Sequence, residues 1–403
     1  MRKDKIFYLF IAIVATIAGF SDQISPADEQ QLLMNEEVAA ANSSSFTFMT
    51  SKKQTTTESE MPAAYNAPSR IDVRGAWDFN LNVSFLYRYA REKGLELAGR
   101  LSRLVLPDGS TSYTDDIIQM DYGYHPAFKI GVGMYFNRDD WDFNFYYTRL
   151  HSTDKKRTSV DLGIVWDPNN WTFLEPIWSL YFPLLVPVGR TYDSYAKWKL
   201  ETDIFDFELG RFFYVGKKLT LRPHIGMKAG IIDQNYYNEN LATPDAVTSF
   251  MYFIKNKSDS WLIGPRGGID TKWCFGKGFR LFGNALASLF YQRIKTNIHQ
   301  EVPFQDNHNY IEDYSAKDKS RFVNTYLEGI LGFGWGDYLA NNKLFLDISL
   351  GYDFSIYFNQ NMIRSFWNSI QTVGFPPSFH AHDDGNPNNL MFHGLNVKAQ
   401  FDF

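Results

Sequence analysis

The segment LFLDISLGYDFSIYF, residues 344–358, alternates large apolar residues with small or polar residues from Leu346 to Ile356. Every second residue from Leu344 to Phe358 is apolar, and Asp347, Ser349 and Asp353 lie between them. A period of two residues is typical of a β-strand with one apolar face. The run is far longer than the roughly 5–6 residues that are usual in soluble proteins. It therefore predicts a strand that crosses a membrane.

The same alternation recurs on both sides of this segment. It predicts strands in nine further ranges: 77–89, 128–136, 141–148, 198–211, 219–231, 261–274, 281–292, 324–335 and 395–403. The phase slips between Thr202 and Ile204, which predicts a β-bulge there. The connections between the strands alternate in length. Short links at 137–140, 215–218, 275–278 and 336–342 alternate with long links at 99–116, 153–193, 233–259, 295–319 and 359–389.

This regular alternation of links predicts an all-β fold, a transmembrane antiparallel up-and-down β-barrel of about ten strands. The short links would be periplasmic turns, the long links extracellular loops, and both ends of the barrel would lie on the periplasmic side. Twelve strands are the alternative if the link 153–193 hides two more, for which Thr158 to Trp166 is a candidate.

The aromatic content favours the barrel over a secreted β-sandwich or propeller. The chain of 403 residues holds 35 Phe, 24 Tyr and 10 Trp. Many rings lie near strand ends, as in the girdles at membrane surfaces. They are Trp77, Tyr87, Tyr89, Phe136, Trp141, Tyr147, Trp198, Trp335 and Phe358. The mean hydropathy of −0.32 excludes a bundle of membrane helices.

Charge and cysteine content exclude other classes of protein. The net charge of −5 gives no reason to expect nucleic-acid binding. Cys274 is the single cysteine, so an intrachain disulfide is impossible.

The beginning of the chain resembles an export signal. Residues 1–21 combine a basic start with an apolar stretch and small residues, so we expect a signal peptide cleaved near residue 21, with a single anchor helix as the alternative. Residues 22–69 are polar and predict a flexible segment with a possible short helix. The barrel domain would then occupy 70–403, in the outer membrane of a Gram-negative cell.

The polar face of the predicted strands would line the lumen. It carries both signs of charge, at Arg88, Lys129, Asp142, Asp206, Glu208, Arg222, Lys228, Arg266, Asp270, Glu328, Asp347, Asp353 and Lys398. Such a lining predicts a porin for passive diffusion of small polar solutes. The alternative is a structural or adhesive barrel whose opposite charges pair and close the lumen, with surface loops that bind partners.

Catalytic and metal-binding signals are weak. The common hydrolase, metalloprotease and phosphate-loop motifs do not occur, so we expect no enzyme and no cofactor. The nearest catalytic candidates are His125 and His151, with Asp121 and Asp154 close in sequence. The stretch HAHDDGN (380–386) offers cation ligands, but a polar loop tip is the simpler interpretation, and we predict no metal site.

One apolar stretch lies inside a predicted loop. Residues 171–188 are apolar but contain Pro176, Pro183 and Pro187, which forbid a regular spanning helix. The stretch could narrow the lumen, rest on the outer surface of the membrane, or contact another copy of the chain.

Several strings resemble a known family. The stretches 85–99, 126–152, 198–234, 346–362 and 393–403 are similar to MOMP-like porins, the Legionella-type major outer membrane protein family, which is related in style to the chlamydial protein. The resemblance covers nearly all of 77–403 and implies a pore-forming outer-membrane barrel. Members often carry cysteines that cross-link chains, and Cys274 alone departs from this pattern.

The expected partners follow from this placement. They are outer-membrane lipid, small polar solutes, a possible second copy of the chain, and the barrel-assembly machinery, for which Phe403 would be the terminal aromatic signal.

Overall fold

The computed structural model describes Val73 and residues 78–136, 141–176, 190–243, 249–303, 311–361 and 388–403. The chain divides into two compact units, Met1–Tyr65 and Asn66–Phe403, and every described residue belongs to the second. The predicted signal peptide and the polar segment 22–69 lie outside the described residues and stay predictions.

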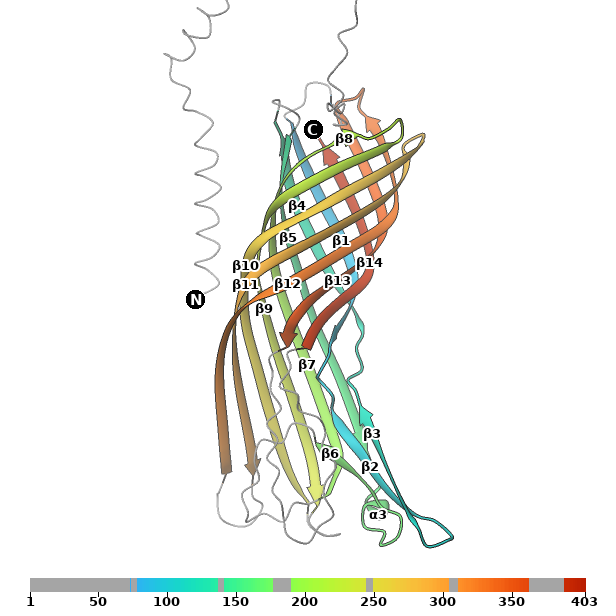
Figure 1. Ribbon diagram of the computed structural model, residues 1–403, viewed down its shortest axis with the longest axis vertical. Helices are drawn as coiled ribbons and strands as arrows, with labels where there is room; N and C mark the ends of the chain where they lie inside the picture. The colour runs from blue at the N-terminus through green and yellow to red at the C-terminus, as the bar shows by residue number, and fades with distance from the viewer. Residues whose placement is uncertain are drawn as a thin grey trace, which may run out of the picture. The chain divides into compact units, whose positions relative to one another are not determined.

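Ten long antiparallel strands close into a barrel (Figure 1). They are β1 (Phe79–Glu92), β4 (Tyr124–Tyr135), β5 (Trp141–Ser159), β7 (Arg190–Arg211), β9 (Leu219–Thr243), β10 (Phe250–Gly276), β11 (Phe279–Pro303), β12 (Ile311–Leu339), β13 (Leu344–Asn361) and β14 (Asn388–Asp402). Each pairs with the next, and β1 pairs with both β14 and β4, which closes the sheet. The prediction of a ten-strand barrel is confirmed.

The twelve-strand alternative is wrong. Residues 158–166 hold the end of β5 and the short helix α3 (Leu162–Val165) rather than two more barrel strands. Three additional strands lie outside the closed ring: β2 (Ala98–Val105), β3 (Thr111–Ile118) and β6 (Thr172–Pro176). They continue the sheet from the N-terminal end of β7, where β6 pairs with Thr191. The two-residue β8 (Phe213–Tyr214) pairs with the start of β9.

Two of the predicted long loops are mostly strand. β9 continues to Thr243 and β10 begins at Phe250, and β11 continues to Pro303 before β12 begins at Ile311. Figure 1 shows β9 to β12 running on past the ends of β13 and β14. The inner positions there hold amides such as Asn238 and Asn240, and the outward positions become polar or charged, as at Asn235 and Glu239, so the apolar period ends while the pairing continues. We call this end of the barrel the hairpin end and the other the short-turn end.

The predicted bulge near Thr202 is also wrong. β7 pairs without interruption with β5 and β9 through residues 202–204, and its register shifts instead between Thr191 and Asp193. The alternation slips because Ile204 is an apolar residue that faces inward, where it is 5% exposed.

Outward-facing residues form an apolar band around the short-turn half of the barrel. Exposed members include Phe85, Ile130, Ile225, Leu289, Phe333, Leu350 and Val397. Its edge toward the hairpin end carries paired rings, among them Tyr87 with Tyr124, whose centroids lie 5.3 Å apart, and Trp261 with Tyr291, at 5.7 Å.

Beyond the rings, the outward positions become charged. On β10, Trp261 is followed toward the tip by Asp259, which is half-buried, and Lys257, which is exposed. The band therefore marks the membrane-spanning part, and the hairpin end extends into water. No helix among the described residues is long and apolar enough to cross a membrane.

The core of the fold lies inside the barrel. Its buried apolar side chains include Leu86, Leu200, Ile232, Leu262 and Phe290. Trp198, predicted as an interface ring, belongs to this interior: it is fully buried, and its Nε1 donates to Gln234 Oε1 at 3.1 Å. At the edge of the apolar band, β7 instead contributes Phe205, which stacks on Tyr147 at a centroid distance of 5.1 Å.

Candidate functional site

The structure places every predicted pore-lining residue on the inner side of the barrel. All are at alternate positions of β1, β4, β5, β7, β9, β10, β12, β13 and β14, as the strand period requires. Most lie in the membrane-spanning half, where they form a connected ionic network rather than an open lining.

Arg222 on β9 is the centre of this network. Its Nε donates to both carboxylate oxygens of Asp142, at 2.9 and 3.0 Å, and its Nη1 donates to Glu208 at 3.0 Å and to Asp270 at 2.9 Å. The guanidinium occupies the space in front of Gly210, where an added Cβ would lie only 2.8 Å from it. Glycine at this position of β7 therefore makes room for the network.

Further ion pairs extend the network along the wall. Arg266 contacts Asp206 at 2.6 Å and Glu208 at 3.0 Å, and Lys228 contacts Asp206 at 2.8 Å. Arg88 pairs with Asp353 at 2.6 Å across the β1–β14–β13 region, and Arg280 pairs with Asp347. Because each partner is almost fully buried, removing one would leave an uncompensated charge.

A polar cavity of about 140 Å³ lies beside this network. Its lining includes Lys129, Arg222, Asp270, Lys272, Glu328 and Lys398. Sequence reasoning missed Lys272, Arg280 and His224 as lining residues. Lys272 could have been found, because it lies two positions after Asp270 on the same strand face.

A layer of rings separates the cavity from the hairpin end of the lumen. This aromatic layer consists of Phe290, Tyr326, Tyr357 and Phe392, all buried. Tyr357 touches the other three, with centroid distances of 4.3 Å to Tyr326 and 6.1 Å to both Phe290 and Phe392. On the cavity side, the Nζ of Lys228 lies 4.4 Å from the centre of the Tyr326 ring.

Beyond the aromatic layer, buried amides fill the lumen. Gln292 donates to Gln360 Oε1 at 2.5 Å and accepts from Asn324 at 2.7 Å, and Gln360 donates to Ser260 at 3.1 Å. Each of these side chains is almost fully buried. Their hydrogen bonds satisfy groups that would otherwise be costly inside a dry lumen.

The link from β1 to β2, residues 93–97, crosses the lumen above these amides. Leu95 and Leu97 are buried, the Tyr236 hydroxyl donates to the Glu96 carbonyl at 3.3 Å, and the Asn361 amide donates to the Lys93 carbonyl at 3.0 Å. We call residues 93–97 the cap segment. In the described part of the chain, the lumen is therefore closed toward the hairpin end.

A buried carboxyl group lies next to the cap segment, outside the membrane-spanning band. Glu92 accepts a 3.3 Å hydrogen bond from Gln234, whose own carbonyl accepts from Trp198. Burial raises the pKa of Glu92 from its ordinary 4.5 to about 8.

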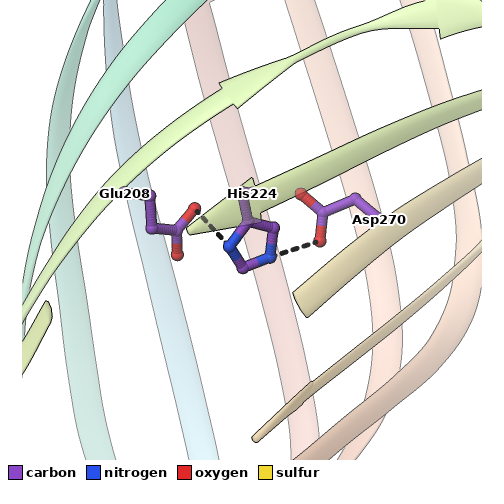
Figure 2. Close-up of side chains that lie close together, drawn as sticks. All are labelled: Glu208, His224 and Asp270. Atoms are coloured by element: carbon purple, nitrogen blue, oxygen red, sulfur yellow. Dashed lines mark ion pairs between the residues drawn. The ribbon is translucent and has the colours of Figure 1, made fainter. Parts of the chain in front are cut away.

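Glu208, His224 and Asp270 form the one group of potential metal ligands found among the described residues (Figure 2). The His224 ring lies between the two carboxylates, at 4.0 Å from Glu208 and 3.7 Å from Asp270. Arg222 already contacts both carboxylates, and Arg266 contacts Glu208. Two guanidinium groups so close would repel a divalent cation, so the cluster is better described as part of the ionic network.

The predicted catalytic candidates do not gather into one site. His125 Nε2 lies 2.9 Å from Asp154 Oδ1. His151, however, faces Glu201 at 3.9 Å, and Asp121 pairs with Lys156 at 2.6 Å. The HAHDDGN stretch lies outside the described residues.

The apolar stretch 171–188 is only partly described. Residues Thr172–Pro176 form β6, which pairs with β2 and with Thr191 of β7 outside the closed ring. Residues 177–188 lie outside the described part, so the three predicted roles of this stretch stay open.

Comparison with known sequences now identifies the family. A family profile described as the Legionella pneumophila major outer membrane protein precursor matches residues 49–403. The chain belongs to this major outer membrane protein family. The predicted resemblance is confirmed, and the chain is an outer-membrane β-barrel protein. No curated protein matches its sequence.

Solved structures similar to this family member are also outer-membrane barrels. The outer membrane protease OmpT of Escherichia coli is 10% identical, covers 83% of this chain and 99% of its own, and has a TM-score of 0.32. A Pseudomonas aeruginosa FadL homologue is 9% identical, covers 81% and 89%, and has a TM-score of 0.23.

Proposed function

We propose that this outer membrane protein forms a narrow pore for small polar solutes, which the aromatic layer and the cap segment close at rest. The observation that carries the proposal is the polar cavity of about 140 Å³ in the membrane-spanning half of the lumen. A cavity lined by charges of both signs is suited to hydrated ions and small polar solutes.

The contrast between the two halves of the lumen supports this proposal. Near the hairpin end, the barrel fills its interior with apolar side chains and paired amides. Replacing buried ion pairs by apolar residues is often neutral or stabilising, so charges are not needed merely to fill a barrel. Their presence beside a cavity is better explained by a hydrated path.

Opening the pore requires the cap segment and the aromatic layer to move. The cap segment accepts hydrogen bonds from the side chains of Tyr236 and Asn361. Its backbone N–H groups at Lys93 and Leu97 donate to the carbonyls of Asn389 and Ile118. Each such bond contributes only about 0.5–1.5 kcal/mol. Because Leu95 and Leu97 are also buried, displacing the segment costs on the order of several kcal/mol, so we expect the open state to be rare and brief.

Solute permeation into proteoliposomes tests the proposal. We expect vesicles that contain the folded protein to swell in isosmotic glycine and to stay unchanged in isosmotic raffinose, because only the smaller solute passes a narrow lumen. Swelling in glycine at the rate of protein-free vesicles would contradict the pore.

The second candidate is a closed barrel that presents its hairpins to partners outside the cell. The filled lumen near the cap segment favours it, as do exposed charges such as Lys257 and Lys317 on the extended strands. This candidate predicts no permeation of either solute and loss of surface binding when the hairpin ends are removed.

Both candidates share further expectations. We expect no enzymatic activity, assembly by the barrel-assembly machinery and a possible homo-oligomer. The position of Phe403 supports the assembly signal: it is exposed at the end of β14, and its backbone N–H donates to the Phe79 carbonyl at 2.9 Å. Phe403 thus lies where the barrel closes, between β14 and β1.

A further inference from the structure

We propose that the lumen cavity binds a small oxyanion of the size of phosphate, held by Lys129, Lys272 and Lys398. The inference deepens the proposed pore function and rests on it, since the anion would be a solute in transit. The geometry that carries it is a cavity lined by cations whose neighbouring carboxylates are already engaged by arginines.

The arginines take up most of the negative charge of the lining. Four carboxylates line the cavity: Glu208, Asp270, Glu328 and Asp347. Glu208 forms ion pairs with Arg222 and Arg266, Asp270 with Arg222, and Asp347 with Arg280. Glu328 is the remaining carboxylate, and it accepts a hydrogen bond from the Tyr326 hydroxyl at 2.5 Å.

The three lysines have no ion-pair partner among the described residues. Lys129 lies with its Nζ 4.6 Å from the centre of the Tyr146 ring, and Lys272 lies 4.6 Å from that of Phe212. Lys398 lines the same cavity. Outside the lining, Asp402 accepts hydrogen bonds from Tyr135 and Gln400. Three ammonium groups therefore line one small cavity. Glu328 is the one carboxylate of this lining that forms no ion pair with an arginine.

The strand register brings two of these lysines to one row. Ser84 on β1 pairs with Lys129 of β4 on one side and with Lys398 of β14 on the other. Their backbones are thus two strand spacings apart, about 10 Å. Two lysine side chains can span such a gap and converge on one anion in front of Ser84, while Lys272 comes from β10.

The size and polarity of the cavity fit such a ligand. About 140 Å³ is close to the 150 Å³ of an engineered cavity that holds benzene in another protein. Neutral hydrogen-bonding side chains of the lining, Asn80, Ser84 and Gln400, can complete the coordination. An oxyanion would offset the mutual repulsion of the lysines, which a cation would increase.

Calorimetric titration of the folded barrel in detergent with inorganic phosphate, at constant ionic strength and pH 7, tests the inference. We expect saturable binding of one phosphate per chain. The double variant Lys129→Gln/Lys398→Gln should weaken it at least tenfold. The matched control Lys317→Gln changes an exposed lysine on the β12 extension and should leave it unchanged.

Lysine acetylation read by mass spectrometry gives a second measurement that needs no variant. Phosphate should slow acetylation of Lys129 and Lys398 several-fold and leave that of Lys317 unaffected. Absence of saturable binding to the wild type, equal binding by the double variant, or equal acetylation with and without phosphate would overturn the inference. A barrel that binds phosphate but never conducts would refute the pore and leave the binding site standing.

Discussion

Single side chains in the lumen connect strands that lie far apart in the sequence. Arg222 joins Asp142 of β5, Glu208 of β7 and Asp270 of β10, so one guanidinium links four neighbouring strands. The inward direction of these residues could be predicted from the strand period alone. Their pairing could not, because it depends on register, and register depends on strand ends that the period does not define.

Substitution of Arg222 should destabilise the barrel strongly. Arg222→Met keeps much of the side-chain volume but removes the ion-pair partner of the buried Asp142 and one partner of Glu208 and of Asp270. Removing one member of such a buried network costs about 3–5 kcal/mol. Urea unfolding in lipid vesicles measures the loss. The control Arg157→Ala breaks the exposed pair with Asp193 and should cost less than about 1 kcal/mol. Equal stability of the two variants would contradict the central role of Arg222.

Glu92 should make the stability of the barrel depend on pH. Its folded pKa of about 8 is above the ordinary 4.5, so the folded state binds more protons between these values. Stability is then fully present below pH 4.5 and falls as the pH rises toward 8, by up to about 1.4 kcal/mol per pH unit.

Glu92→Gln removes this dependence, because the amide does not ionise. Unfolding curves recorded from pH 5 to pH 8 should show the variant losing less stability than the wild type as the pH rises. Parallel pH profiles for the two proteins would show that Glu92 does not titrate in this range.

At the scale of strands, the period of two predicted the number and order of the barrel strands but not their length. The pattern places the extensions of β9 to β12 in loops because their outward positions there are polar or charged, as at Glu239 and Lys257, which ends the apolar period. The aromatic layer was missed for the opposite reason. Phe290 and Tyr326 are apolar or aromatic residues on the polar face, and a sequence pattern assigns such residues to lipid.

The tight turn between β10 and β11 should depend on Gly278. This residue has a φ of +80°, and an added Cβ would collide with the Gly336 carbonyl. Gly278→Ala should cost at least about 1–2 kcal/mol, because a left-handed backbone is unfavourable for alanine. Refolding yield into detergent, read by heat-modifiable gel mobility, measures the effect.

Gly216 in the neighbouring turn is the matched control. Its φ is not in the left-handed region, and an added Cβ would meet no atom within 4 Å. Gly216→Ala should therefore refold like the wild type. Equal refolding yields of Gly278→Ala and Gly216→Ala would show that the geometry of the first turn is not required.

For the barrel as a whole, the central feature is a lumen divided by the aromatic layer. On one side lie the ionic network and the polar cavity, and on the other lie buried amides and the cap segment. The sequence indicated the alternatives of an open and a closed lumen without deciding between them. In the structure, one part of the lumen holds a polar cavity and the other part is filled by side chains. This division is the basis of the proposed gated pore.

Single-channel recording in planar bilayers tests the gated pore most directly. Phe290→Ala removes one ring of the aromatic layer, and Leu331→Ala makes a comparable truncation on the lipid-facing surface. We predict small, brief conductance steps for the wild type and for Leu331→Ala, and steps several-fold larger for Phe290→Ala. Folded barrels that never conduct, or a Phe290→Ala conductance equal to that of the wild type, would contradict the account.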